Sequence, residues 1–172
     1  MENKYETRIK KVFEDVIPMF VNEDGKVRIE DIAELEEFID ARLRYLYVTK
    51  KIKNEIQFFC GFFKWNEEDE TTISDEQVDT WEEAEDVKIS LHLTKDSNRK
   101  NKSEEKLLEE CLTMVKNVLD TSLFMDIDVN IWMDEHENTN NEMEYTYMSS
   151  LCLTKTNFNT NHPTHAYQGR ID

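Results

Sequence analysis

Residues 87–94 read VKISLHLT, and this stretch decides the fold class. Apolar side chains at Val87, Ile89, Leu91 and Leu93 alternate with polar side chains. A period of two is typical of a strand that buries one face and exposes the other. The sequence therefore predicts a sheet that is covered on one face only, as in an antiparallel α+β domain.

Three further segments predict strands around this one. Residues 55–65, EIQFFCGFFKW, are aromatic and interrupted by Gly61, which indicates a bulge or a close backbone approach. Residues 124–134 alternate, with apolar positions such as Ile131 expected to face inward and the intervening polar positions outward. Residues 143–153 follow the polar turn EHENTNN. Together the four segments predict a four-stranded, mainly antiparallel sheet.

Three segments have the apolar spacing of amphipathic helices. The first spans residues 2–20 and should end near Pro18, and the second runs from Ile29 toward Thr49. Ser103 is a candidate N-cap for the third helix. The predicted order is an N-terminal helical hairpin and then β-β-α-β-β, with the helices on one face of the sheet.

The composition indicates a single folded domain. Nine Phe and three Trp provide a core, whereas residues 155–172 are Asn-rich and lack periodicity. We therefore expect one α+β domain over residues 1–154 and a flexible, extended tail over residues 155–172.

The cysteine content and the hydropathy pattern point to a cytoplasmic protein. Three cysteines without CxxC spacing suggest neither a disulfide framework nor a zinc cluster. The charged start of the chain does not resemble a signal peptide, and no apolar run approaches the roughly 20 residues of a membrane span.

The negative charge of the chain is regional. Residues 67–86 and 117–154 together hold 19 of the 38 acidic residues and none of the 21 basic residues. This charge cannot be buried unpaired, so it must face water or a cationic partner. The same field repels phosphate backbones and anionic membranes, so neither direct binding of duplex DNA nor membrane binding is expected.

Two tryptophans lie among these acids and are candidate anchors for a partner. Ser74 and Gln77 have capping-box spacing, which predicts a short helix carrying Trp81, although Trp81 could equally cover the edge of the core. Trp132 lies on the outward face of its predicted strand. The candidate partner-binding residues are Glu67, Glu68, Asp69, Glu70, Asp75, Glu76, Asp79, Trp81, Glu82, Glu83, Glu85, Asp126, Asp128, Trp132 and Asp134.

Carboxylates spaced along a rigid surface can imitate the phosphates of a duplex. The size and charge of the chain are similar to those of phage counter-defence proteins that mimic DNA and of immunity proteins that cap toxin nucleases. The leading hypothesis is therefore a small acidic binding protein that inhibits or neutralises a basic, nucleic-acid-acting protein. Basic residues cluster at 42–53 and 95–106, so a homo-oligomer that pairs these clusters with the acidic stretches is a further possibility.

Two alternatives involve metal ions. Asp126 and Asp128, joined by Glu144 from the neighbouring strand, could hold a divalent ion in a metal-dependent hydrolase. However, the sequence contains no GxSxG elbow, P-loop or dinucleotide fingerprint, which argues against an enzyme and predicts no cofactor.

The second alternative rests on residues 20–32, FVNEDGKVRIEDI, which resemble the loop of an EF-hand. With Gly25 as the turn glycine, Asn22, Asp24 and Asp31 fall at ligand positions, whereas Phe20 stands where the first carboxylate belongs. The resemblance implies a divalent-ion-responsive interaction module. The alternative is a helical hairpin whose turn is made by Asn, Asp and Gly.

Overall fold

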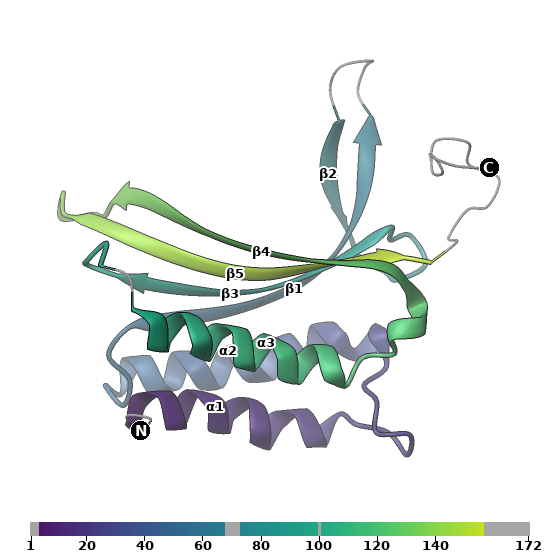
Figure 1. The fold of residues 1–172 in the computed structure, drawn as a ribbon, viewed down its shortest axis with the longest axis horizontal. Coiled ribbons are helices and arrows are strands. Elements are labelled where there is room, and N and C mark those ends of the chain that lie inside the picture. Colours follow the sequence, from purple (N-terminus) through teal and green to yellow (C-terminus); the bar gives the residue numbers. More distant parts are fainter. Residues whose placement is uncertain (1–3, 68–72, 100, 157–172) are drawn as a thin grey trace.

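The structure, a computed structural model, describes residues 4–67, 73–99 and 101–156 (Figure 1). Three α-helices are formed by Lys4–Val16 (α1), Ile32–Val48 (α2) and Lys102–Asn117 (α3), with short 3-10 helices at Ile17–Met19, Ile29–Asp31 and Thr121–Leu123. The predicted N-terminal helical hairpin is present. α1 ends at Val16 because Pro18 cannot donate the backbone hydrogen bond that would continue it.

The described residues form one antiparallel sheet of five strands. These are Glu55–Glu67 (β1), Ile73–Val78 (β2), Asp86–Lys95 (β3), Phe124–Glu137 (β4) and Met143–Lys155 (β5). Their order across the sheet is β2-β1-β3-β5-β4, and every neighbouring pair is antiparallel. The α+β class is therefore confirmed, but the prediction of four strands is wrong.

The additional strand, β2, lies where a helix was predicted. Its backbone pairs with the second half of β1, with Phe62 opposite Val78 and Trp65 opposite Asp75. The capping-box spacing of Ser74 and Gln77 favours a helix only locally, whereas pairing satisfies the backbone groups of two segments at once. The β1–β2 hairpin projects from the sheet on the side away from the helices (Figure 1).

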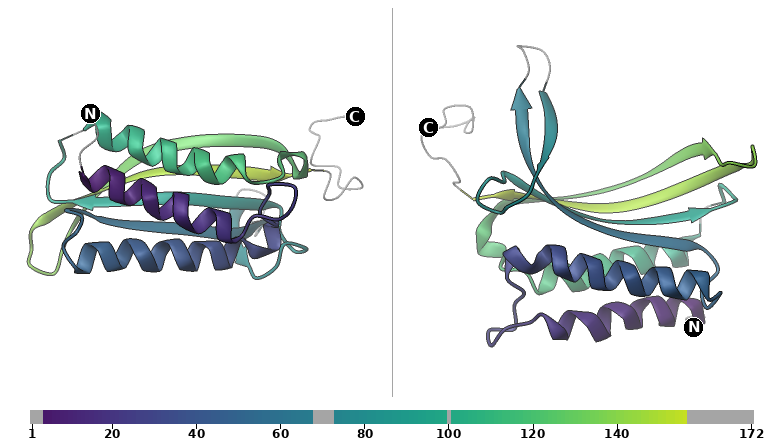
Figure 2. Two further views of the ribbon diagram at one scale, coloured as in Figure 1. Left: turned by 90° about the horizontal axis from the view of Figure 1, so that it is seen from below. Right: turned by 180° about the vertical axis from the view of Figure 1, so that it is seen from behind.

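The helices cover one face of the sheet. α2 and α3 lie against it, and α1 packs along both of them as an outer layer (Figure 2). Val87, Ile89 and Leu91 are fully buried on this side, as their alternation predicted. The Phe13 ring on α1 meets the Phe58 ring edge-on at a centroid distance of 5.4 Å, so α1 also reaches the sheet.

α2 also caps part of an edge of the sheet. β2 pairs only with residues 62–67 of β1, which leaves backbone amides unpaired in the earlier part of that strand. Asp40 Oδ1 accepts a hydrogen bond from the Phe58 amide at 2.9 Å. Glu36 Oε1 accepts one from the Cys60 amide at 3.1 Å. The two helix carboxylates thus satisfy donors that an additional strand would otherwise take.

The N-cap of α3 lies two residues before the predicted one. Asn101, not Ser103, is the N-cap, and its side chain accepts hydrogen bonds from the amides of Ser103 and Glu104. The Ser103 hydroxyl instead donates to Glu6 Oε2 on α1 at 2.5 Å. The prediction of Ser103 as the cap is wrong because this hydroxyl links two helices.

Candidate partner-binding surface

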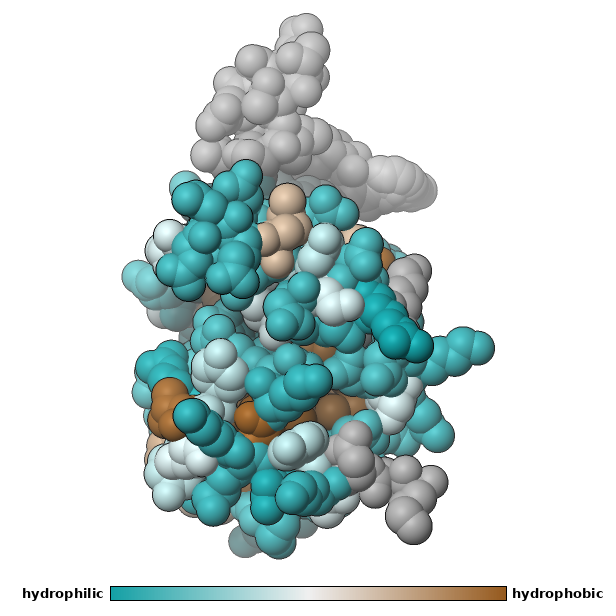
Figure 3. Space-filling model, turned by 90° about the vertical axis from the view of Figure 1, so that its left-hand side faces the viewer, coloured by the Kyte–Doolittle hydropathy of each residue, from teal (hydrophilic) through white to brown (hydrophobic). Residues whose placement is uncertain are grey.

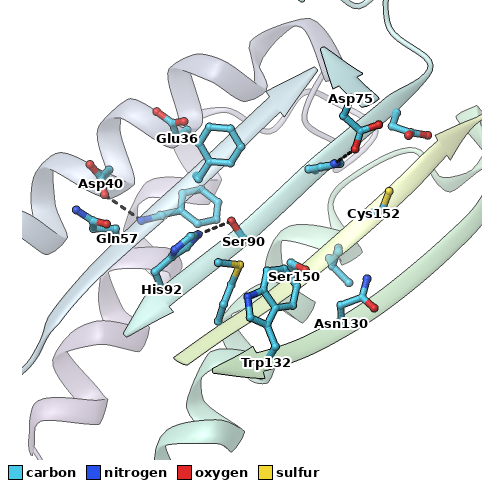
Figure 4. Close-up of a pocket in the computed structure, with 16 residues that line it drawn as sticks. Glu36, Asp40, Gln57, Asp75, Ser90, His92, Asn130, Trp132, Ser150 and Cys152 are labelled. Carbon is cyan, nitrogen blue, oxygen red and sulfur yellow. Dashed lines mark hydrogen bonds and ion pairs between the residues drawn. The ribbon is translucent and has the colours of Figure 1, made fainter. Parts of the chain in front are cut away.

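The open face of the sheet, opposite the helices, contains a groove of about 690 Å³ (Figure 4). Side chains from α2 and from all five strands line it. The polar positions of β3, such as Ser90 and His92, lie at its centre, with Glu36 and Asp40 on one side and Asn130 and Trp132 on the other (Figure 4). The alternation of residues 87–94 therefore provides both the core and the groove.

Aromatic rings cover the part of the open face on β1. The Phe59 and Phe63 rings lie on either side of Gly61, with their centroids 6.2 Å apart. A Cβ atom at Gly61 would lie 2.7 Å from the Phe59 ring, so glycine is the residue that allows these rings to pack over the backbone. The predicted bulge at Gly61 does not form, since Gly61 pairs in register with Lys88, and the groups that closely approach its backbone are the two aromatic side chains.

The end of the groove next to the β1–β2 hairpin is polar. Lys88 forms an ion pair with Asp75 and lies 4.6 Å from the centre of the Phe63 ring. Asp86 is buried, and its Oδ2 accepts a hydrogen bond from the Trp65 indole at 3.0 Å. Burial raises the pKa of Asp86, although the interactions with Trp65 and Thr154 oppose this shift.

The titratable groups at the centre of the groove are uncharged near neutral pH. Burial lowers the pKa of His92, whose Nε2 lies 2.9 Å from the Ser90 hydroxyl. Burial also raises the pKa of the Cys152 thiol to about 11, with the nearby Asp86 adding to the shift. A protonated thiol is a poor nucleophile, so Cys152 is poorly suited to nucleophilic attack.

The first acidic stretch surrounds the hairpin, and part of it is already paired. Asp75 pairs with Lys88, Glu76 pairs with Lys64 at 3.7 Å, and Glu85 Oε1 accepts a hydrogen bond from the Trp65 amide at 2.6 Å. Glu67 ends β1, whereas the predicted partner-binding residues Glu68, Asp69 and Glu70 lie outside the described residues.

The turn after β2 carries Trp81, which lies at the edge of the core. Its ring packs against Phe62 and Phe124, with centroid distances of 6.2 and 5.9 Å. Lys155 lies over the same ring at 4.4 Å and donates to the Trp81 carbonyl at 2.8 Å. The structure thus shows the core-edge alternative for this tryptophan, while Asp79, Glu82 and Glu83 around it are exposed.

The second acidic stretch lies on β4, at the opposite edge of the sheet from the hairpin. Asp126, Asp128 and Asp134 are exposed, and within the described ranges none of their carboxylates has an ion-pair or side-chain hydrogen-bond partner. Trp132 lies between them on the same face, 44 % exposed, and lines the groove (Figure 4). The acidic stretches therefore flank the open face from its two sides.

The other face of β4 departs from prediction. Val129, Ile131 and Met133 were expected to face inward, and they do lie on the helical side of the sheet, but they remain 59, 55 and 37 % exposed. The reason is that α3 packs on β3 and β5 and stops short of β4. Alternation predicted which face these side chains occupy, but it did not predict that the face would be uncovered.

The alternative metal cluster of Asp126, Asp128 and Glu144 does not form on the open face. Asp126 lies opposite Thr154, whereas Glu144 lies opposite His136, ten positions further along β4. That separation is roughly 33 Å at the rise of a strand. Glu144 instead contacts His136 at 3.3 Å. No group of three or more potential metal ligands converges anywhere in the part of the chain that the structure describes.

The segment that resembles an EF-hand loop is a tight hairpin turn. Val21 and Val27 form a β-bridge, Gly25 has a φ of 76°, and the Asn22 side chain accepts the amides of Asp24 and Lys26. The side-chain oxygen of Asn22 is thus already hydrogen-bonded to two backbone amides. Asp24 is exposed, and Asp31 occupies the N-cap position of α2. The geometry agrees with the alternative turn of Asn, Asp and Gly.

A second pocket of about 370 Å³ lies at the end of the molecule where α1 begins. The surface at this end is mostly hydrophilic, with few hydrophobic side chains in view (Figure 3). The pocket's main charges are paired internally: Lys95 contacts Glu104 at 2.8 Å, and Asn54 donates to the same carboxylate at 3.2 Å. These contacts join α3 to the end of β3 and to the loop before β1, so the groove on the open face is the stronger candidate site.

Sequence reasoning missed Glu36, Asp40 and Asp86. Glu36 and Asp40 are four residues apart on a helix, and nothing in their spacing indicates that they meet the edge of a sheet. The sequence pattern could have placed Ser90, His92 and Cys152 in the groove, because they occupy the open-face positions of strands in which apolar and other residues alternate.

Comparison with known protein families gives no match for this chain. Comparison with functionally characterised proteins also gives no significant match. Among the described residues, no helix has both the length and the apolar character needed to cross a lipid bilayer.

Proposed function

We propose that this chain is a small acidic binding protein that holds a basic partner protein against the open face of its sheet and thereby inhibits it. The observation that supports this most directly is the row of exposed carboxylates at Asp126, Asp128 and Asp134, which have no partner among the described residues. Trp132, within the same row, supplies an aromatic contact of the kind that dominates many interfaces.

The charges around the groove favour a cationic occupant. Lys88 is the one permanent cation among the described residues that line the groove, and Asp75 already neutralises it. Glu36 and Asp40 on α2 and Asp86 on β3 are further acidic residues of the groove. Complementary charge accelerates association and selects partners, and salt screens it over about 10 Å at moderate ionic strength.

The partner that fits best is a protein that acts on nucleic acid. On the open face of β4, Asp126 and Asp128 lie roughly 7 Å apart, and Asp134 lies roughly 20 Å further along the strand. Such a row of fixed negative charges suits a surface built to hold phosphates. A counter-defence or immunity role in the cytoplasm would use this property, with the bound protein excluding the partner's nucleic acid.

The test is affinity capture from the source cells with two matched variants. One variant carries Asp126→Lys, Asp128→Lys and Asp134→Lys on β4. The control carries Glu14→Lys, Glu37→Lys and Glu109→Lys, which reverse the same number of exposed charges on the helical side. Mass spectrometry then identifies the captured proteins, and a nucleic-acid-binding or cleavage assay measures inhibition.

We expect the wild type and the helical control to retain a basic nucleic-acid-acting protein at low salt and to inhibit it. The β4 variant should lose both properties, and high salt should weaken the complex. Recovery of no basic protein, or equal capture by the two variants, would overturn the proposal.

A further inference from the structure

The outer edge of β4 has no strand partner among the described residues. β4 spans 14 residues and pairs with β5 along nearly its whole length, and it ends the strand order of the sheet. The backbone groups on its far side therefore have no strand partner in the described ranges and can pair with a further strand. A long edge strand of this kind is a template for strand addition.

The two edges of the sheet differ. At the other edge β2 has only six residues, and the neighbouring part of β1 is capped by Glu36 and Asp40. Natural sheets protect their edges with lysine, proline, short strands or covering elements. Residues 124–137 contain no lysine, arginine or proline, and in the part of the chain that the structure describes β4 is protected only by its acidic side chains and by a register irregularity between Phe124 and Asp126.

The helical side of β4 requires an apolar occupant. Val129, Ile131 and Met133 form an uncovered apolar stripe beside α3. A small pocket of about 100 Å³ lies next to them and is lined by Leu108 of α3 as well as by Ile131 and Met133. Apolar side chains on an added strand would bury this stripe and gain the associated hydrophobic free energy.

The open side of β4 requires a basic occupant. Asp126, Asp128 and Asp134 alternate with the apolar stripe, so an added strand would meet carboxylates on this face. A second copy of β4 would place acidic residues near acidic residues, which disfavours pairing. Charge thus selects a basic strand over another copy of this chain.

We propose that β4 accepts an extended segment of the basic partner as a sixth strand, in which apolar residues alternate with lysine or arginine. The apolar residues lie on the side of α3, and the basic residues lie on the open face. This inference rests on the proposed function, because it takes the partner to be basic, and it names the part of the partner that docks.

The test uses two synthetic peptides of the same composition, acetylated and amidated at their ends. The sequence KVKVKVK alternates, whereas KKKKVVV places the same residues in blocks. We expect calorimetry to show at least tenfold tighter binding of the alternating peptide. Amide hydrogen exchange should slow in residues 126–134 and stay unchanged in residues 58–60, whose amides are already capped.

N-methylation makes the test specific for backbone pairing. In a strand the valine amides all point to one edge and the lysine amides to the other. Methylating one set should therefore abolish binding, and methylating the other set should leave it unchanged. Loss of binding with both sets, or with neither, contradicts strand addition.

Protein variants separate the two proposals. Ile131→Glu should weaken the alternating peptide at least tenfold, whereas Val48→Glu, at an exposed apolar residue on α2, should not. A different result would overturn strand addition: the two peptides bind equally well, Asp128→Lys weakens both, and Ile131→Glu weakens neither. That result would leave the electrostatic proposal standing. Strand addition would also be overturned if neither peptide bound, or if sedimentation showed a dimer of this chain that Ile131→Glu dissociates. The capture experiment would then test the proposed function separately.

Discussion

Glu36, on the second helix, accepts a hydrogen bond from the backbone amide of Cys60, 24 residues away on the first strand, at 3.1 Å. Asp40, one helical turn later, does the same for Phe58. A helix that already packs on the sheet thus also satisfies two backbone amides at its edge. Burial raises the pKa of Glu36, and the hydrogen bond from Cys60 opposes that shift.

Removing these acceptors should destabilise the protein. Glu36→Ala and Asp40→Ala each leave a backbone donor without its partner, at a cost of about 1–3 kcal/mol. Glu36→Gln keeps an acceptor oxygen and should cost less, and Glu37→Ala, on the exposed neighbouring residue, should cost little. Urea denaturation of the four variants measures these differences, and equal stability of Glu36→Ala and Glu37→Ala would contradict the capping role.

Asp86 should make stability depend on pH. Because burial raises its pKa in the folded protein, the folded state holds this proton more tightly than the unfolded state does. Its contribution to stability is therefore full below the ordinary value of 3.8 and is lost as pH rises through the folded pKa. Asp86→Asn keeps an acceptor for Trp65 and removes the charge, so it should gain stability relative to wild type over that interval.

Denaturant unfolding at a series of pH values measures this effect. Glu82→Gln removes the same charge from an exposed turn and serves as the control. A stability difference between Asp86→Asn and wild type that shrinks as pH rises would have the wrong sign for a raised pKa.

Two glycines should tolerate alanine poorly for different reasons. At Gly61 the new Cβ would lie 2.7 Å from the Phe59 ring and 2.9 Å from the Phe63 ring, which should cost about 1–3 kcal/mol. Gly25 has open space around it but a φ of 76°, so alanine there should cost about 1–2 kcal/mol. Thermal denaturation measures both costs.

Second substitutions distinguish the two mechanisms. Adding Phe59→Leu should recover part of the loss at Gly61, because it removes the ring that the Cβ meets. Gly25→Asn should be milder than Gly25→Ala, because Asn adopts left-handed backbone more readily. No recovery at Gly61 would mean that the backbone, and not the ring, is the obstacle.

The Cys152 thiol should react slowly with alkylating reagents. A pKa of about 11 lowers its thiolate population near pH 8 by roughly two orders of magnitude relative to a free cysteine. Iodoacetamide labelling followed by mass spectrometry should therefore show slow modification of Cys152 in the folded protein and rapid modification in urea. Equally fast labelling in both states would contradict the buried environment.

The sequence predicted those parts of the fold in which one segment carries its own signal. The alternation of residues 87–94 and the stripe of α2 are examples, because burial on one face dictates each pattern. β2 carries no such signal: ISDEQV is acidic and has capping-box spacing, and it is a strand because β1 offers it a partner. Asn101 and Ser103 show the same limit, since only the position of Glu6 on another helix determines which side chain caps α3.

The candidate site was predictable to a similar extent. The exposure of Asp126, Asp128 and Trp132 followed from the strand pattern, whereas the position of Trp81 depended on two aromatic residues distant in sequence. Convergence of Asp126 with Glu144 failed because it depended on the register of β4 against β5, which composition does not encode.

The unequal edges of the sheet also limit how many molecules can join it. One edge ends in a short strand beside backbone amides that α2 has already satisfied, and the other is a long strand with no outer partner among the residues that the structure describes. A protein whose sheet can be extended at one edge only does not link its own copies edge to edge into a fibre. By capping the amides of Phe58 and Cys60, the carboxylates of Glu36 and Asp40 disfavour strand addition at this edge. The protein can then keep the other edge available for a partner without polymerising.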